Sequence, residues 1–347
     1  MSTHKKITIV GGGLAGLTLG IGLRQRKIPV TVREAGHYPR NRVCGEFING
    51  RGQEALARLG LREPLVQAGA VTARTGAFFS PKASSPVRRL PAPALCLSRL
   101  VLDALLAEQF RRLGGELREN EAWRQNELQE GIVRASGRRS RPRERGWRWF
   151  GLKVHARNVS LAADLEVHAV PNGYVGCCRL PGGEVNICGL FRRVPGALAP
   201  AGQWQELLRG PLDTPLRARL AGAAFIENSF CSVAGLSLRP QRAAACAECC
   251  VGDALTMTPP VTGNGMSMAF ESAELALGPL ARYSRGELSW AAAQHELAAA
   301  CDSAFRRRLA WAKWLQWMMF ASALQGSLGS IALRSEWLWR LMFTRTR

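Results

Sequence analysis

The sequence predicts an α/β protein in three parts: a parallel β-α-β unit near the N-terminus, an antiparallel sheet inserted in the middle of the chain, and a helical C-terminus. Three observations predict this class. A β-branched run meets a cluster of glycines near the start of the chain, short apolar runs separated by glycine turns follow Trp147, and the residues from Leu288 onward indicate helices. At 347 residues the chain is long enough for more than one domain.

The run Ile7–Val10 predicts a buried strand, because β-branched side chains suit a pleated surface. The residues that follow fit the pattern G-x-G-x-x-G, with Gly11, Gly13 and Gly16 at the glycine positions. In this pattern the first glycine permits a tight turn, the second lets a pyrophosphate approach the backbone, and the third lets the helix pack close to the strand. The stretch therefore predicts a Rossmann-like dinucleotide-binding turn, and a glycine-rich turn without a ligand is the alternative.

The next segments complete the expected β-α-β unit. An apolar helix begins with Leu14 and Ala15, and its free N–H groups and positive dipole end would face a phosphate. A second strand is predicted at Pro29–Val32. Glu34 closes this strand roughly 20 residues after the glycines, where a carboxylate can hold a ribose hydroxyl. We therefore expect Leu14, Ala15 and Glu34 to belong to the cofactor site.

Short strands are predicted in the middle of the chain, at 154–159, 161–170, 173–179 and 184–191. Pro181-Gly182-Gly183 is a hairpin signal, so we expect an antiparallel sheet, followed by a helix at Trp204–Arg209. The expected organisation is a discontinuous cofactor-binding domain over 1–70, 94–145 and 240–285, a substrate-binding sheet domain over 71–93 and 146–239, and C-terminal helices over 286–347.

Later segments add further signals. A strand over 131–138 ends in Ser136-Gly137-Arg138, a buried strand is predicted at Cys249–Ala254, and a Pro-rich loop leads from it to a helix that begins at Gly265. Another helix is expected after Ser98, which is a typical N-cap residue. The early glycine motif, the Ser-Gly-Arg and the late Gly-Asp together resemble the FAD-dependent oxidoreductases of the para-hydroxybenzoate-hydroxylase-like superfamily, which includes geranylgeranyl reductases, flavin monooxygenases and halogenases.

This resemblance extends over most of the chain up to about Tyr283, and it implies FAD as the cofactor with NADPH or NADH as the electron donor. It implies that Asp253 accepts hydrogen bonds from a ribityl hydroxyl and that Arg99 lies near the FAD phosphates. The turn before the helix at Gly265 would place N–H groups against the flavin pyrimidine, where positive charge stabilises the reduced flavin. The other residues that the resemblance implies at the cofactor are Arg42, Gly137, Gly252, Pro260, Gly263, Asn264, Gly265 and Met266.

Two departures from the family pattern bear on catalysis. The segment Arg42-Val43-Cys44-Gly45-Glu46 resembles the reductases' Arg-x-x-Cys-Gly-Gly, which passes beside the isoalloxazine, but Glu46 replaces the second glycine. Cys44 could tune or protonate the flavin, or it could be a packed thiol. Ser136 precedes Gly137 where hydroxylases often carry Asp-Gly in a segment that helps bind FAD and NADPH.

Three reactions remain open at this point. The halogenase motif Trp-x-Trp-x-Ile-Pro is missing, since Trp147-Arg148-Trp149-Phe150 shares only the tryptophan spacing. The function we expect is hydroxylation of a hydrophobic aromatic or polyketide-like substrate by a monooxygenase that uses reduced flavin and O₂. Reduction of a lipophilic alkene by a geranylgeranyl-reductase-like enzyme is the first alternative, and halogenation is the next.

Two histidines of the predicted sheet are candidate bases, because a histidine on the side facing the flavin could deprotonate a phenol. If the strands alternate, His155 shares a face with Lys153, and His168 with Glu166. The candidate catalytic residues are therefore Cys44, His155 and His168. The alternative for both pairs is a polar outer face of the sheet.

The net charge of +21 is consistent with acidic partners, but no nucleic-acid-binding motif accompanies it, so specific nucleic-acid binding is not expected. A basic surface-binding protein is the non-enzyme alternative. Tryptophans and arginines interleave between Trp311 and Phe343, which predicts peripheral contact with a membrane or a cap over a lipophilic pocket; a helix pair packed on the core is the alternative. The ten cysteines are scattered and no signal peptide is apparent, which favours reduced thiols in the cytoplasm. No metal site is expected, because Cys246-Ala-Glu-Cys249 has no second ligand pair.

Overall fold

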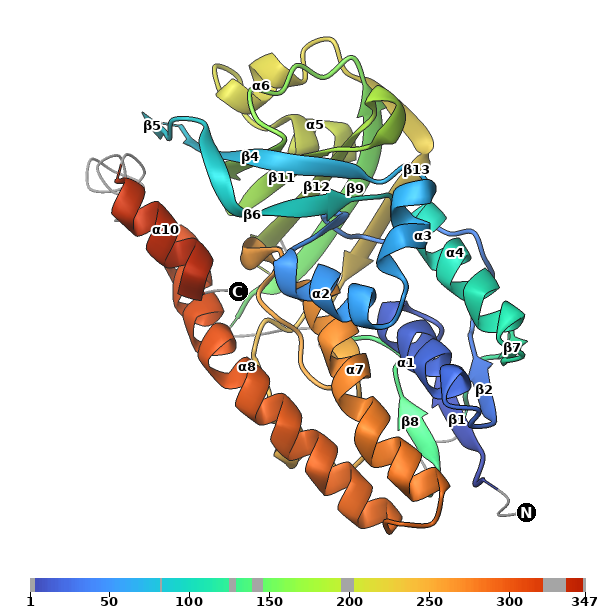
Figure 1. Ribbon diagram of the computed structural model, residues 1–347. Coiled ribbons are helices and arrows are strands. Elements are labelled where there is room, and N and C mark those ends of the chain that lie inside the picture. The colour runs from blue at the N-terminus through green and yellow to red at the C-terminus, as the bar shows by residue number, and fades with distance from the viewer. Residues whose placement is uncertain are drawn as a thin grey trace.

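The computed structural model describes residues 4–81, 83–124, 129–138, 146–194, 203–320 and 335–345 (Figure 1). The part of the C-terminal segment between 321 and 334, which entered the sequence interpretation, lies outside the described residues. Within them, the expected α/β class is confirmed: the chain forms a parallel sheet, a larger curled sheet and C-terminal helices.

The small sheet is parallel and has the strand order β7-β2-β1-β8. Its strands are β1 (Ile7–Val10), β2 (Val30–Arg33), β7 (Glu116–Arg118) and β8 (Ile132–Arg134). Helix α1 (Leu14–Gln25) joins β1 to β2, which confirms the expected β-α-β unit. The strand side chains of β1 are almost entirely buried because the sheet is covered by α1, as expected for a parallel sheet.

The predicted strand at Cys249–Ala254 was wrong in its extent. Only Cys250 bridges to the sheet, through Arg134 of β8. The chain leaves the sheet at Gly252, which has φ +64° and donates its N–H to the Ser272 hydroxyl at 2.9 Å. A 3₁₀ turn, η3 (Gly252–Ala254), follows and carries Asp253 away from the strand direction.

The large sheet has the strand order β13-β9-β12-β11-β10-β4-β6-β3, with β5 paired to β4. Its strands are β3 (Phe47–Ile48), β4 (Val71–Ser80), β5 (Ala83–Ser84), β6 (Arg88–Cys96), β9 (Arg148–Arg157), β10 (Leu165–Val170), β11 (Gly173–Arg179), β12 (Val185–Arg193) and β13 (Ala224–Ala234). The Pro181–Gly183 turn joins β11 to β12 as an antiparallel hairpin, as predicted. The sheet is not wholly antiparallel, however, because β4 and β10 are parallel neighbours that come from distant parts of the chain.

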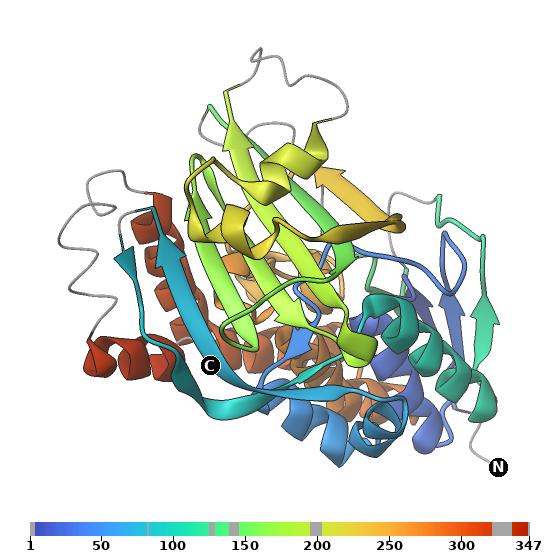
Figure 2. The same ribbon diagram turned by 90° about the horizontal axis from the view of Figure 1, so that it is seen from above.

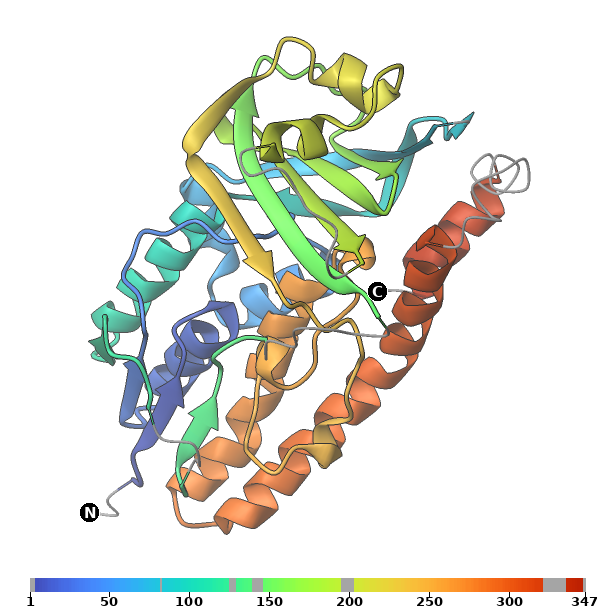
Figure 3. The ribbon, with the colours of Figure 1, turned by 180° about the vertical axis from the view of Figure 1, so that it is seen from behind.

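Helices surround the two sheets (Figures 1 and 3). They are α2 (Gly50–Arg58), α3 (Arg62–Gln67), α4 (Arg99–Arg112), α5 (Trp204–Arg209), α6 (Pro215–Arg219), α7 (Gly265–Ser284), α8 (Trp290–Phe320) and α10 (Glu336–Arg345). The Ser98 hydroxyl caps α4 by accepting the Val101 N–H at 3.3 Å, and α5 has the predicted bounds. None of the helices in the described ranges has the length and hydropathy needed to cross a membrane.

The packing defines which face of the large sheet is available to a ligand. Side chains of α5 and α6, among them Leu208 and Leu216, pack on Val154 and Ile187 and cover one face. Helices α5 and α6 lie over the outer side of this sheet, seen from above in Figure 2. The opposite face looks toward the small sheet and α7, and this is where the cavity lies.

Candidate functional site

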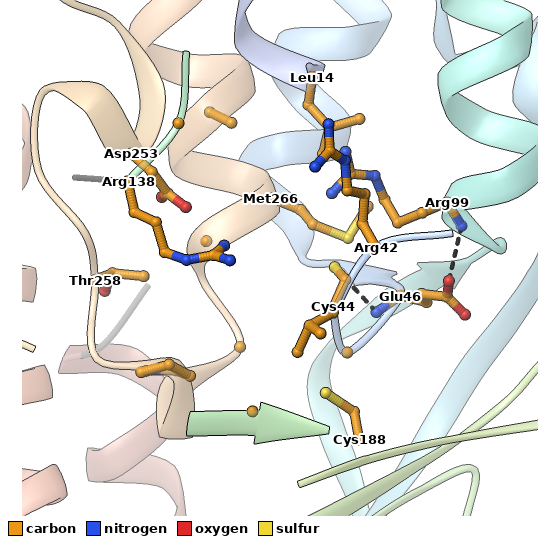
Figure 4. A pocket seen from close by; sticks show the side chains of 18 of the residues that line it. Leu14, Arg42, Cys44, Glu46, Arg99, Arg138, Cys188, Asp253, Thr258 and Met266 are labelled. Carbon is orange, nitrogen blue, oxygen red and sulfur yellow. Dashed lines mark hydrogen bonds between the residues drawn. The ribbon is translucent and has the colours of Figure 1, made fainter. Parts of the chain in front are cut away.

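A cavity of about 960 Å³ lies between the two sheets. Its walls come from the β1–α1 turn, the segment that follows β2, the inner face of the large sheet, the loop after η3 and the N-terminus of α7. In Figure 4, Leu14, Arg42, Cys44 and Arg99 stand on one side of this space, and Arg138, Asp253 and Thr258 stand on the other. The volume lies at the upper end of the range of about 300–1,000 Å³ that is usual for ligand pockets.

The three motif glycines have different surroundings. A Cβ at Gly11, where φ is +109°, would meet the Ala135 carbonyl oxygen at 2.4 Å, and one at Gly16 would meet the Gly11 carbonyl oxygen at 1.9 Å. A Cβ at Gly13 would have no described atom within 4 Å, and Gly13 lines the cavity with Leu14 and Ala15. The turn is thus tightly packed behind and open in front, which fits the approach of a diphosphate.

The N-terminus of α1 faces this open space. Gly13 is its N-cap, no side chain caps it, and its first turn contains no acidic residue among the described atoms. Uncapped N–H groups and the positive end of the helix dipole form a ready site for an anion. Gly16 itself does not line the cavity, since it lies against the strand behind the turn.

Glu34 lies directly after β2, as predicted, and it lines the cavity. Its carboxylate accepts the Gly12 N–H at 2.7 Å and the Gly36 N–H at 2.9 Å, and it pairs with Arg40. Burial alone would raise the pKa of Glu34, but these hydrogen bonds and the charge of Arg40 outweigh it and lower the pKa to about 2. The group is therefore an ionised acceptor at neutral pH, as a ribose hydroxyl requires.

Arginine side chains line the cavity on several sides. Arg99 is held by Asp103 through two bonds of 2.6 and 2.8 Å, and the charge of Asp103 raises the arginine's pKa although burial lowers it. This pairing fixes the direction of the guanidinium, which lines the cavity. The lining also contains Arg33, Arg40, Arg42, Arg134 and Arg138. Because Arg33, Arg40 and Arg134 are paired with carboxylates, a dianionic diphosphate would gain most from Arg42 and Arg138 and from the directed donors of Arg99.

The opposite wall contains most of the late motif. Asp253 lines the cavity beside Arg138 (Figure 4), and burial raises its pKa, an effect that the charges of Arg138 and Arg99 reduce. A Cβ at Gly252 would meet Ala15 Cβ at 2.8 Å, so the motif packs directly on α1. Of the predicted cofactor residues in this region, those that line the cavity are Gly252, Asp253, Pro260, Gly263, Gly265 and Met266, together with Gly137 on the β8 side.

Asn264 does not line the cavity. Its side chain is buried, and its Oδ1 accepts a hydrogen bond from Nδ2 of Asn49. The Oδ1 of Asn49 accepts the Gly52 N–H and so caps α2. Asn264 therefore braces the start of α7 against α2. Helix α7 has no side-chain cap among the described residues, so the N–H groups of its first turn are available to a ligand in the cavity.

Cys44 lines the cavity, and the Glu46 N–H donates to its sulfur at 3.4 Å. Burial raises the pKa of the Cys44 thiol, so the group stays protonated at neutral pH. The backbone at Glu46 has φ +59°, a left-handed conformation that glycine adopts without strain, which explains the glycine of the related reductase pattern.

The Glu46 carboxylate points away from the cavity into the protein. It accepts a hydrogen bond from the backbone N–H of Arg99 at 2.9 Å, lies 3.3 Å from the Lys153 ammonium, and contacts His155 Nε2 at 2.6 Å. Lys153 also donates to the Asn41 side chain at 2.9 Å. These contacts join the loop that carries Cys44 to α4 and to β9 of the large sheet.

The sheet histidines do not line the cavity. The predicted alternation is confirmed, because Lys153 and His155 both reach Glu46 while His168 bonds Glu166 at 2.8 Å. All four side chains are buried, Lys153 and His155 toward Glu46, and Glu166 and His168 beneath α6. His168 stacks on Phe79 at 4.6 Å on the face covered by α6, where Arg219 reaches Glu166, so the structure does not bring His168 to the other candidate residues.

The far end of the cavity is apolar. Tyr174 and Leu190 line it from the large sheet, while Trp339 and Phe343 of α10 pack against Phe78 and close it. The ring of Trp339 meets the ring of Phe78 edge to face with centroids 5.8 Å apart. Of the two roles predicted for the C-terminal segment, α10 fulfils that of a cap over the apolar end.

Several cavity residues were missed by the sequence reasoning, and three of them carry charge or contact a charged group. Arg40 orients Glu34, Arg138 faces Asp253, and Trp123 lies under the Arg33 guanidinium at 4.9 Å from its ring centroid. Arg138 had a signal, since it directly follows Gly137 in the Ser-Gly-Arg segment. Arg40 and Trp123 had none, because arginines are abundant throughout the chain and Trp123 lies in a loop without a motif.

Comparison with known proteins agrees with this geometry. Residues 4–155 match the model of the family described as FAD binding domain. A curated relative, Conditioned medium factor receptor 1 of Dictyostelium discoideum, is 28% identical over 126 residues, which are 33% of this chain. The match spans only about a quarter of that relative's length, 25%.

Solved structures share the fold over nearly the whole chain. The p-nitrophenol 4-monooxygenase PnpA from Pseudomonas putida superimposes with a TM-score of 0.73 at 17% identity, covering 99% of this chain and 98% of that one. The myxobacterial chondrochloren halogenase CndH has a TM-score of 0.73 at 19% identity, covering 99% and 90%. The flavin-dependent brominase Bmp2 has a TM-score of 0.72 at 15% identity, covering 99% and 95%.

The chain thus shares its fold with solved flavin-dependent monooxygenases and halogenases, and its N-terminal part matches an FAD binding domain. It has the fold of the para-hydroxybenzoate-hydroxylase-like superfamily, and the resemblance inferred from its sequence motifs is confirmed. The FAD binding domain match and the arginine-lined glycine turn support FAD as the cofactor.

Replacing Asp253 by alanine is expected to weaken FAD retention by about tenfold, because the cavity loses a hydrogen-bond acceptor where the ribityl hydroxyls would lie. Titration of the apoprotein with FAD, followed by flavin fluorescence, measures this loss. Glu54→Ala is the control, since Glu54 is exposed on helix α2 and does not line the cavity. Full flavin retention by Asp253→Ala would remove Asp253 from the cofactor site.

Proposed function

We propose that this protein is an FAD-dependent monooxygenase that hydroxylates a hydrophobic aromatic or polyketide-like substrate. The single observation that carries the proposal is the continuity of the cavity. It runs from the glycine turn and its arginines to an apolar compartment of aromatic side chains at the inner face of the large sheet. A ring-shaped apolar substrate fits the second region as a diphosphate fits the first.

Different residues of the chain would bind the cofactor and the substrate. Glu34, Arg42, Arg99 and the N-terminus of α1 would hold the ribose and the diphosphate, and Asp253 would hold the ribityl chain. When bound, FAD would supply the electrons and, once reduced, the reaction with O₂. The apolar wall of Tyr174, Leu190 and Trp339 would orient the substrate and exclude water.

The electron donor we propose is NADPH or NADH. The test is to purify the protein, record its visible spectrum, and follow NADPH and NADH oxidation with and without oxygen. Flavin absorbance with O₂-dependent oxidation that phenolic lipophiles stimulate is the expected result. Rapid reduction that turns over only with an alkene acceptor would replace hydroxylation by alkene reduction, and absence of flavin after reconstitution with FAD would contradict both.

One observation favours alkene reduction as the second candidate. Cys44 stands in the cavity as a protonated thiol, in the segment that resembles the reductases. When a hydride adds to one carbon of an alkene, a thiol is able to donate the proton that the other carbon requires. We expect Cys44→Ser to bind FAD as the native protein does but to turn over about tenfold more slowly. Cys301→Ser is the matched control, because Cys301 is buried among core side chains away from the cavity. An unchanged rate for Cys44→Ser would make Cys44 a packing residue.

Halogenation remains the third candidate. A halogenase would pass hypohalous acid to the substrate through a lysine, but no lysine lines the cavity in the part of the chain that the structure describes. The buried Lys153 is held by Glu46 and Asn41 beside the site rather than in it. The likeness to brominase and halogenase structures is a likeness of fold.

A further inference from the structure

Three exposed tryptophans lie outside the cavity on α8 and α10. The exposed fractions are 44% for Trp314, 62% for Trp317 and 69% for Trp337, whereas the other large apolar side chains that are comparably exposed in the described ranges are valines and leucines. Helix α10 lies beside the C-terminal end of α8 (Figures 1 and 3), so the three tryptophans come from two neighbouring helices. The ring of Trp314 meets the ring of Trp311 edge to face with centroids 5.5 Å apart, but much of each of the three indoles remains open to solvent.

Exposed cations accompany these rings. Residues 303–320 contain three arginines and one lysine and no acidic residue. Arg308 is buried and paired with Glu271 by bonds of 2.8 and 2.6 Å, but Arg306, Arg307 and Lys313 are exposed. Arg307 lies two turns before Trp314 and Lys313 one turn before Trp317, so cations and rings follow the same side of the helix.

A shallow second cavity of about 740 Å³ opens on the same helix. Arg242, Arg306 and Lys313 line it, and Leu309 and Ala310 contribute apolar surface. The carboxylate in this cavity, Asp302, already accepts the Ala243 and Ala244 N–H groups at 2.7 and 3.2 Å. The hollow therefore presents positive side chains beside an apolar patch, which suits a phosphate headgroup with an attached acyl region.

We propose that this tryptophan–arginine surface docks on a lipid membrane that carries anionic headgroups; it consists of Arg242, Arg306, Arg307, Lys313, Trp314, Trp317 and Trp337. Each cation near an anionic bilayer contributes about 1 kcal/mol, and indole rings settle at the boundary between headgroups and acyl chains. The protein's net charge of +21 adds long-range attraction to such a surface. A single-stranded nucleic acid would instead be held in a basic groove, whereas these rings project from a helix.

The proposal does not depend on which reaction the cavity performs. It does place α10 at the lipid, and the same helix closes the apolar end of the cavity with Trp339 and Phe343. A lipophilic ligand would thus find the cavity wall next to the phase in which it dissolves.

The test is co-sedimentation of the full chain with large vesicles of phosphatidylcholine, alone or mixed with phosphatidylglycerol. We expect binding to the mixed vesicles, weakening with added salt, and a blue shift of tryptophan fluorescence. R306Q/R307Q/K313Q should lower the affinity by about a hundredfold, as three cations at about 1 kcal/mol each imply. W314Q/W317Q/W337Q should lower it by about tenfold or more and remove the blue shift.

Two control variants test whether the loss of vesicle binding is specific to this surface. R26Q/R51Q/R62Q removes the same charge from exposed arginines elsewhere, and V66Q/V101Q/L212Q removes exposed apolar side chains elsewhere, so both should bind vesicles more tightly than the corresponding surface variants. Flavin content and thermal midpoint establish that each variant is folded. The proposal would be overturned if the control variants lost as much vesicle affinity as the surface variants, or if the protein bound neutral and anionic vesicles equally well. Binding of a labelled oligonucleotide without binding of vesicles would also overturn it.

Discussion

Replacing Glu46 by glutamine is expected to lower the free energy of unfolding by about 3 kcal/mol. The carboxylate is fully buried, and its two oxygens contact the Lys153 ammonium, His155 Nε2 and the backbone N–H of Arg99. Removing one member of a buried ion pair leaves the other charge without compensation, and this costs more than the pair contributes when it is intact. Glutamine keeps the size of the side chain, so the loss measures the charge rather than a cavity.

The same variant should also bind FAD less tightly, because Glu46 holds the loop that carries Arg42 and Cys44 against α4 and β9. Denaturant unfolding of the apoprotein and FAD titration measure the two effects separately. The double variant Glu46→Gln/Lys153→Met removes both charges and should recover a large part of the lost stability. Native stability in Glu46→Gln, or no recovery in the double variant, would show that the ion pair does not hold the loop.

Glu46→Gly is a second comparison at this position. The residue has φ +59°, and glycine there should relieve strain of about 1 kcal/mol. It nevertheless leaves Lys153 buried without its partner, so we expect the glycine variant to remain less stable than the native protein. The conformational gain and the electrostatic loss can be separated by comparing the glycine and glutamine variants.

The features that sequence predicted well are those whose physical cause is local. The glycine turn, the Glu34 carboxylate at the end of β2, the Ser98 cap and the Pro181–Gly183 hairpin each depend on a few neighbouring residues. The role of Glu46 depends on β9, about a hundred residues away in the chain, and sequence reasoning marked it only as a departure from a pattern.

The missed elements have similar explanations. Strand β13 was not predicted because its pairing with β9 shifts register between Ile226 and Cys231, so its apolar residues do not alternate. His168 was grouped with the candidate bases because alternation places a side chain on one of two faces without saying which face is covered. The face that carries His168 lies beneath α6, and only the folded chain shows it.

Gly16→Ala is expected to lower the free energy of unfolding by about 3 kcal/mol and to abolish FAD binding. The new methyl group would lie 1.9 Å from the Gly11 carbonyl oxygen, a backbone atom that cannot rotate away. Helix α1 would have to move off β1, which costs packing energy at the upper end of the range for overfilled cores and displaces the turn.

Gly13→Ala differs in its effect, because no described atom lies within 4 Å of its added Cβ. It should keep native stability yet bind FAD at least about tenfold more weakly, since the methyl group occupies the approach to the backbone. Gly222→Ala, in an exposed turn where the nearest atom would lie 3.7 Å from the added Cβ, should leave both stability and FAD binding close to native. Thermal unfolding and flavin titration of the three proteins provide the comparison. Unweakened FAD binding in Gly13→Ala would place the diphosphate away from this turn, whatever the stability of Gly16→Ala.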